Sequence, residues 1–293
     1  MFAPEPPAFG TAMLPLGTYD GEVVFITGGG TGLGRAMAIE FARLGAAVAI
    51  VSRKAEHRAA GVEAVESVGA KAVGVEVDIR DPAKIAAGFD EVEAALGPVS
   101  VLINNAAGNF EVPAERMSPN AWRAVTQIVL DGTFFCSTEF ARRRIAAGLP
   151  GAILNIGATY SWTGGPGASH SAAAKAGVAN LTMSLSVEWG RDGIRVNNLA
   201  PGVFPHGDQD EHWGEGREQA SIDRGATVPA GRPGRLHELG WAATYLCSPF
   251  AAYVSGHNFV IDGANWHRRH GFSMPEYVSV RDRADAREGG GTG

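Results

Sequence analysis

A glycine-rich turn between an apolar run and a helix-forming segment constrains the fold of this chain more than any other feature. The apolar run Val23–Ile26 leads into residues 27–34, which read TGGGTGLG. Apolar residues then recur at helical spacing from Leu33 to Leu44, and a second apolar run, Ala47–Val51, follows at once. This order predicts strand, turn, helix and strand, with the backbone N–H groups of the turn gathered at a helix N-terminus.

The same alternation continues along the chain. Further helices are expected at 55–68, 82–96, 118–147, 168–189 and 236–247, and further strands at 71–77, 99–103, 152–156, 195–199 and 258–261. Strands that alternate with helices form right-handed βαβ units and a parallel sheet covered on both faces. The predicted fold class is α/β: a Rossmann-like, doubly wound parallel sheet of seven strands in a single domain, residues 21–266.

Composition indicates one domain with two loosely patterned ends. The chain has 293 residues, 45% of them hydrophobic, and no break in composition divides it. Residues 1–20 are rich in proline and are expected to form an N-terminal arm, and residues 267–293 a C-terminal tail. Residues 203–235 are rich in glycine, proline and charge and too long for an ordinary connection, so they are a candidate substrate lid.

Charge and hydropathy argue against several classes of partner. A net charge of −6 and a pI near 5.8 leave no basic patch for nucleic acid. No apolar run approaches the roughly 20 residues of a membrane span, and neither a leader nor a peroxisomal signal is evident, so a cytoplasmic protein is expected. The eight histidines show no metal-binding spacing, so no metal is expected, and Cys136 and Cys247 resemble buried apolar residues.

The glycine turn predicts a dinucleotide site. Gly28 would permit the tight turn, Gly32 the close approach of a pyrophosphate, and Gly34 the packing of helix on strand; the alternative is a purely structural loop. At the end of the second strand, where an acidic residue would bind the ribose of NAD, the chain reads Ser52-Arg53-Lys54. A guanidinium there favours the 2′-phosphate of NADPH, unless these residues are only a solvated helix start.

These motifs resemble those of the short-chain dehydrogenase/reductase family in order and separation, together with Asn104–Gly108 and the Pro201-Gly202 turn. In that family a Tyr stands four residues before a helical Lys, a Ser thirteen residues before that Tyr, and an Asn in the preceding helix. Here these positions read Ser171, Ala158 and Val129, and only Lys175 matches. Proton transfer from the usual Tyr to a carbonyl oxygen is therefore not expected.

One branch of the family, the NADPH-dependent 2,4-dienoyl-CoA reductases, resembles the chain from about residue 12 to residue 264. The motifs that carry the resemblance are residues 12–15, 25–34, 104–110, 118–122, 128–130 and 171–177. The most specific are Asn-Ala-Ala-Gly-Asn-Phe, residues 105–110, and the Ser that replaces Tyr four residues before Lys175. Asp131 and the sequence of the candidate lid depart from the pattern.

The resemblance implies a set of site residues. The implied catalytic residues are Tyr160, its partner Asn109, and the supporting Ser171 and Lys175. The implied cofactor residues are Gly28, Gly30, Thr31, Gly32, Leu33, Gly34, Ser52, Arg53, Asp78, Ile79, Asn105, Ala106, Ala107, Lys175, Pro201, Gly202 and Val203. The implied substrate residues are Arg53, Arg80, Asn109, Phe110, Ser118 and Tyr160. Asp78 has an alternative as a cap for the helix that begins at Asp81-Pro82.

The implied reaction explains why the usual Tyr is dispensable. Hydride added to the δ-carbon of a 2,4-dienoyl thioester pushes charge onto the thioester oxygen, where a Tyr O–H and an Asn N–H₂ can form an oxyanion hole. The resemblance also implies a 3-enoyl-CoA product, a role in unsaturated fatty-acid β-oxidation and a homotetramer, although helices buried within a monomer would show the same apolar pattern. The alternatives are a carbonyl reductase and a non-catalytic NADPH-binding protein.

Overall fold

The chain folds around one parallel sheet, as a computed structural model shows for residues 5–208, 215–268 and 279–289. Within these residues the sheet has seven strands in the order β3-β2-β1-β4-β5-β6-β7, each parallel to its neighbours. The strands are β1 Val23–Thr27, β2 Ala47–Val51, β3 Ala72–Val75, β4 Val101–Asn104, β5 Gly151–Ile156, β6 Ile194–Pro201 and β7 Asn258–Ile261. The strand order reverses between β1 and β4, which is where open sheets of this kind bind ligands.

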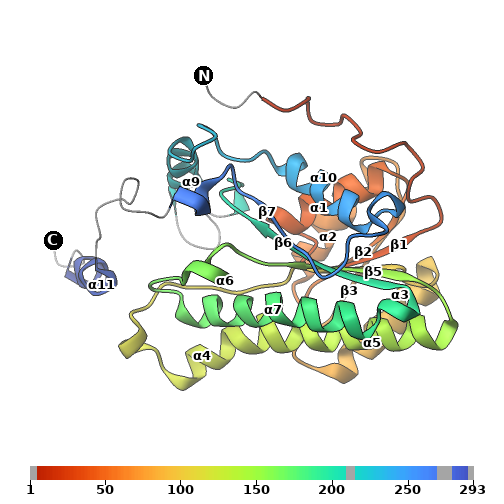
Figure 1. Ribbon diagram of the computed structural model, residues 1–293, viewed down its shortest axis with the longest axis horizontal. Helices are drawn as coiled ribbons and strands as arrows, with labels where there is room; N and C mark the ends of the chain where they lie inside the picture. Colours follow the sequence, from red (N-terminus) through yellow and green to blue (C-terminus); the bar gives the residue numbers. More distant parts are fainter. Residues whose placement is uncertain (1–4, 209–214, 269–278, 290–293) are drawn as a thin grey trace.

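Helices cover both faces of the sheet (Figure 1). The α-helices are α1 Gly32–Arg43, α2 Ala55–Glu66, α3 Pro82–Leu96, α4 Pro119–Thr126, α5 Gly132–Ala147, α6 Tyr160–Thr163, α7 Ser169–Glu188, α9 Arg217–Ala226, α10 Leu236–Cys247 and α11 Val280–Gly289. One apolar core joins α1 and α10 to the sheet, and a second joins α3, α5 and α7 to the opposite face. The predicted doubly wound α/β class is thereby confirmed.

Short helical turns complete the secondary structure. They are η1 Ala114–Arg116, the π-helical turn η2 Gln127–Asp131, η3 Gly190–Asp192, η4 Pro249–Ala251 and η5 Asn265–Arg268. A single α-helix was expected over 118–147, but the structure has the π-helical turn η2 between α4 and α5. There the Gly132 N–H bonds to the Gln127 carbonyl five residues earlier. An i→i+5 turn inserts one residue without changing the apolar periodicity enough to be detected from sequence, and such turns are frequent at functional sites.

The candidate lid and the C-terminal tail both contain a helix. Of the candidate lid, residues 203–235, the described part contains α9, while residues 209–214 lie outside the described residues. Of the C-terminal tail, 267–293, the described part contains the end of η5 and α11, while 269–278 and 290–293 lie outside it. α11 is joined to the loop after β4 by the ion pairs Arg281–Glu115 and Arg116–Asp285, at 2.9 and 2.6 Å.

The N-terminal arm contacts α10. The Trp241 indole N–H donates to the Thr11 carbonyl at 3.1 Å, and Arg235 pairs with Glu5 at 2.9 Å. The guanidinium of Arg43 lies over the Phe9 ring, 4.6 Å from its centroid. The arm therefore packs on the helix layer formed by α1 and α10.

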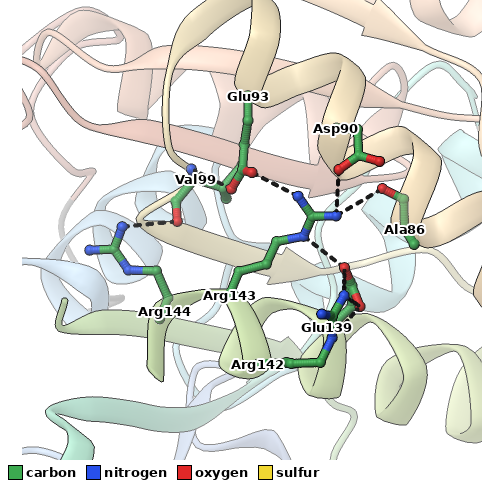
Figure 2. A network of polar contacts seen from close by, with 8 residues as sticks. All are labelled: Ala86, Asp90, Glu93, Val99, Glu139, Arg142, Arg143 and Arg144. Atoms are coloured by element: carbon green, nitrogen blue, oxygen red, sulfur yellow. Dashed lines mark hydrogen bonds and ion pairs between the residues drawn. The ribbon is translucent and has the colours of Figure 1, made fainter. Parts of the chain in front are cut away.

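Arg143, the middle residue of the basic triplet 142–144, stabilises the contact between α3 and α5. Figure 2 shows Arg143 extending from α5 to Glu93 and Asp90, each at 2.7 Å, while it also bonds Glu139 on its own helix. The Arg144 guanidinium donates to the backbone carbonyls of Pro150 and Val99. These arginines serve packing within the chain.

None of the helices in the described ranges is both long and apolar enough to span a membrane.

Candidate active site

The glycine turn is held by hydrogen bonds to the end of the neighbouring strand. The Asn105 side-chain amide donates to the carbonyls of Thr27 and Gly28, both at 3.0 Å. The Thr27 hydroxyl accepts from the backbone N–H groups of Asn105 and Ala106, also at 3.0 Å. The turn at β1 and the Asn-Ala-Ala segment after β4 therefore form one rigid unit at the switch point of the sheet.

Glycine is required in this turn for two different reasons. Gly28 has φ +65°, in the left-handed region that side chains avoid. A Cβ at Gly34 would lie 2.2 Å from the Gly28 carbonyl oxygen, so only glycine lets α1 approach the turn this closely. The sequence predicted a tight turn at Gly28 and close packing of helix on strand at Gly34; the close approach at Gly34 is to the turn itself.

The N-terminus of α1 already contacts an anion supplied by the chain. The Gly32 N–H donates to a carboxylate oxygen of Asp208 at 2.6 Å, and Arg35 lies 3.1 Å from the same oxygen. A helix N-terminus favours negative charge, and the carboxylate stands in for a phosphate group there. The residues present therefore fit the pyrophosphate of a dinucleotide.

Arg53 and Asp78 lie together after the ends of β2 and β3, beside Arg80. Arg53 is 57% exposed at the end of β2, with its guanidinium 3.9 Å from the Asp78 carboxylate. Hydrogen bonds from Arg80, with the Arg53 charge adding to them, lower the pKa of Asp78 to about 2 although burial opposes this. α3 is capped by Asp81, which accepts from the Ala83 and Lys84 N–H groups, so Asp78 is not its cap.

Tyr160, Ser171 and Lys175 lie at the carboxyl end of the central strands. Tyr160 begins α6, four residues beyond β5, where the chain turns into a short helix closed by the Gly164 N–H bond to the Tyr160 carbonyl. The Tyr160 hydroxyl lies 3.1 Å from the Ser171 hydroxyl. Ser171 and Lys175 share one face of α7, and the Lys175 ammonium donates to the Ile156 carbonyl at the end of β5.

Burial shifts the proton affinity of both ionisable groups in this cluster. It raises the pKa of Tyr160, and the hydrogen bond with Ser171 counteracts this only in part. Burial lowers the pKa of Lys175 to about 8. Tyr160 is therefore a neutral O–H donor at physiological pH, and Lys175 is poised between its charged and neutral forms.

Asn109 is placed at the same rim by the loop after β4. Its amide oxygen is buried and accepts no hydrogen bond from the described part of the chain. Its neighbour Phe110 packs edge-on against His170, with ring centroids 4.5 Å apart, and the His170 ring nitrogen accepts from the Ser171 N–H at 2.8 Å. The loop with Asn109 thus lies beside the start of α7. A buried amide oxygen that accepts nothing from the described residues indicates that this side chain is suited to contact a bound group.

Other predicted residues already have structural roles. The Ser118 hydroxyl caps α4 by accepting from the Ala121 N–H at 3.1 Å. Arg80 donates to both carboxylate oxygens of Asp78, at 2.9 Å from Nε and 2.5 Å from Nη2. Gly202 donates to the Ile261 carbonyl at 2.9 Å and so forms, with its neighbours Pro201 and Val203, the turn after β6. Phe110 is 40% exposed and free to contact a ligand.

Sequence reasoning missed Arg35, His206 and Asp208. Asp208 is 176 positions from Gly32, so no local pattern could place it there. It also missed a pair of tryptophans, Trp162 on α6 and Trp266 on η5, with ring centroids 5.8 Å apart. Of these missed residues, only Arg35 had a signal in the sequence, namely its place in the first helical turn after the glycines.

Comparison with known proteins identifies the family of the chain. A family model described as enoyl-(acyl carrier protein) reductase matches residues 28–264. A probable 2,4-dienoyl-CoA reductase [(2E)-enoyl-CoA-producing] of Bacillus subtilis is 42% identical, over 84% of this chain and 96% of its own. The peroxisomal 2,4-dienoyl-CoA reductase [(3E)-enoyl-CoA-producing] of Mus musculus is 37% identical, over 84% of both chains.

Solved structures extend the similarity to three dimensions. A short-chain dehydrogenase from Bacillus anthracis has a TM-score of 0.77 at 41% identity and covers 86% of this chain and 99% of its own. The chain belongs to the short-chain dehydrogenase/reductase family and matches its enoyl reductase model. It is an oxidoreductase of the kind that uses a nicotinamide cofactor, and its curated relatives include 2,4-dienoyl-CoA reductases.

Proposed function

We propose that the protein is an NADPH-dependent 2,4-dienoyl-CoA reductase that forms a 3-enoyl-CoA. The observation that carries the proposal is the half-buried Tyr160 hydroxyl, bonded to Ser171 beside Lys175, at the rim where the amide oxygen of Asn109 accepts no hydrogen bond from the described residues. The names of relatives at 37–42% identity support the substrate class.

Tyr160 and Asn109 would serve as donors to the thioester oxygen. The raised pKa of Tyr160 keeps its proton on the phenol, so that it donates a hydrogen bond and does not carry charge. A donor aimed at the oxygen on which charge develops typically contributes ~3–4 kcal/mol to transition-state stabilisation. Ser171 would orient the Tyr160 hydroxyl, and Lys175 would bind the nicotinamide ribose.

The cofactor preference is argued from the end of β2. When bound, NADPH supplies a hydride to the δ-carbon of the dienoyl group. The exposed Arg53 can bind its 2′-phosphate, and Ser52 beside it offers a hydroxyl where a carboxylate would repel that group. The turn residues 28–34, Asn105–Ala107 and Pro201–Val203 would hold the rest of the dinucleotide, with Asp78 and Ile79 at the adenine.

The position of the remaining double bond depends on where the proton is added. After hydride reaches the δ-carbon, a proton at the α-carbon leaves a 3-enoyl-CoA, whereas a proton at the γ-carbon leaves a 2-enoyl-CoA. The Mus musculus relative is named for the first product and the Bacillus subtilis relative for the second. The proposal is protonation at the α-carbon, because Tyr160 and Asn109 holding the thioester oxygen keep the enolate at that end of the substrate.

The proposal includes a homotetramer, a role in unsaturated fatty-acid β-oxidation and a cytoplasmic location. Apolar side chains on the outer faces of α5 and α7 support subunit contacts: Phe134, Ile145, Met183 and Val187 are 41–83% exposed. A monomer would gain nothing from exposing them. The two cysteines are free buried thiols, which suits a reducing compartment.

The test follows NADPH absorbance with purified protein and 2,4-decadienoyl-CoA, with acetoacetyl-CoA in parallel and NMR of the product. The proposal predicts oxidation of NADPH with the dienoyl thioester alone and a double bond between C3 and C4. Turnover of only the 3-oxo substrate would reassign the protein as a carbonyl reductase. Nucleotide binding without turnover of either substrate would favour a non-catalytic protein.

A further inference from the structure

The segment after β6 inserts a carboxylate into the phosphate position of the glycine turn. Asp208 accepts from the Gly32 N–H at 2.6 Å and pairs with Arg35 at 3.1 Å, and its side chain is only 12% exposed. The His206 ring covers the same glycine: a Cβ at Gly32 would lie 2.8 Å from it. His206 also lies 3.8 Å from the Asp208 carboxylate.

This contact uses the groups that an entering phosphate needs. A backbone N–H at the start of α1 and a guanidinium one turn later together form a site for an anionic oxygen. The Gly32 N–H cannot donate fully to a carboxylate and a phosphate at once, and two anions at this distance repel each other. The carboxylate and a pyrophosphate therefore exclude one another.

We propose that Asp208 is an internal competitor for the cofactor phosphate, and that Arg35 is the cation which the phosphate takes over from it. Nucleotide binding then requires residues 203–208 to withdraw from the glycine turn, which links cofactor occupancy to the position of the segment flanking the site. The inference rests on the proposed use of a dinucleotide and identifies which residues control access to its site.

Competition of this kind weakens the observed affinity. The apparent dissociation constant is the intrinsic one divided by the fraction of molecules in which the anion site is open. Removing the competing charge should therefore tighten binding of any phosphate that uses this site. Asp208→Asn keeps the size of the side chain and leaves an uncharged, weaker acceptor oxygen. Asp208→Ala removes the contact with the Gly32 N–H altogether.

The experiment measures the binding of inorganic pyrophosphate and of NADPH by calorimetry to wild type, Asp208→Asn and Asp208→Ala. Asp223→Asn is the matched control, because Asp223 is an acidic residue on α9 whose carboxylate accepts a hydrogen bond from Gln219 on the same helix. Both Asp208 variants should bind pyrophosphate and NADPH about tenfold or more tightly than wild type, as expected if the open fraction is about a tenth. Asp223→Asn should stay within about twofold of wild type, because it removes the same charge without touching the site.

Pyrophosphate is the deciding probe. Unchanged or weaker pyrophosphate binding in both Asp208 variants would overturn the inference, as would an equal gain in Asp223→Asn. A gain for pyrophosphate in protein that binds no NADPH would uphold the competition at α1 while refuting the proposed cofactor. An additional Arg35→Met substitution in the Asp208→Ala background should reverse the gain if Arg35 is the cation involved.

Discussion

The two ends of the proposed site, the cofactor end at the glycine turn and the catalytic end at Tyr160, differ in what builds them. The glycine turn is shaped by backbone geometry: the φ of Gly28, the approach of Gly34 to the Gly28 carbonyl, and the Asn105 bonds to two carbonyls. The catalytic end is built from side chains on separate elements, with Tyr160 from α6 and Ser171 from α7. Backbone geometry restricts residue identity strongly, whereas a hydroxyl can reach one point in space from several positions in the chain.

This difference explains how the family's Tyr position can become Ser171 without loss of a phenol. Ser171 stands where the family has its Tyr, and its hydroxyl now bonds Tyr160, supplied from eleven residues earlier. Gly34 cannot be replaced in a similar way by a residue elsewhere in the chain, because any Cβ at this position would lie 2.2 Å from a backbone oxygen.

The largest expected effect is on the catalytic end. Asn109→Ala should lower kcat on the dienoyl thioester by about 10²–10³-fold, as for loss of one oxyanion donor. Thermal stability should change little, since the Asn109 amide oxygen accepts no hydrogen bond from described residues. Steady-state kinetics and thermal melting measure both, with the exposed Asn120→Ala on α4 as control. A kcat within twofold of wild type would remove Asn109 from the catalytic set.

Lys175 should make the free energy of unfolding depend on pH in the alkaline range. The folded protein releases this proton near pH 8, because burial lowers the pKa, whereas the unfolded chain keeps it to about 10.5. Between these values the unfolded state binds more protons, so Lys175 by itself makes the free energy of unfolding rise with pH, by on the order of 3 kcal/mol in total. The buried thiols Cys136 and Cys247 have raised pKa values and act in the opposite direction, so the test is the difference between wild type and Lys175→Met in urea unfolding from pH 7.5 to 10.5. The difference should grow with pH in favour of wild type, and a difference that does not change with pH would contradict the lowered pKa of Lys175.

Gly34→Ala should disrupt the cofactor end. The added methyl collides with the Gly28 carbonyl, and the resulting shift should cost about 1–3 kcal/mol of stability and weaken NADPH binding. Gly190→Ala is the control, because a Cβ there meets nothing within 4 Å. Unaltered NADPH affinity in Gly34→Ala, measured by calorimetry, would show that the turn tolerates a side chain.

Arg53→Ala should have the smallest effect and act on one nucleotide only. Loss of a partly solvated charge-assisted bond should weaken NADPH binding about tenfold, or roughly 1.4 kcal/mol, and leave NADH binding unchanged. Parallel titrations with the two nucleotides measure the ratio. An equal loss for both would mean that Arg53 does not contact the 2′-phosphate.

The sequence predicted the sheet, most helix boundaries and the glycine turn, because these depend on local periodicity and on backbone requirements of single residues. It could not predict that Tyr160 begins α6, or that η2 interrupts the helix after Ser118, since neither changes the apolar pattern. It also could not place Asp208 at Gly32, a contact determined only by how the segment after β6 returns to α1. The roles of Tyr160 and Asn109 came from family resemblance.

The most direct test of the central claim compares Tyr160→Phe with Ser171→Ala in single-turnover hydride transfer to 2,4-decadienoyl-CoA at saturating NADPH. If Tyr160 is the oxyanion donor, its Phe variant should lose about 10²–10³-fold in rate, and Ser171→Ala, which only orients that hydroxyl, should lose about tenfold. A Tyr160→Phe enzyme that transfers hydride at the wild-type rate while Ser171→Ala is inactive would contradict the account and return the catalytic role to the family's usual position.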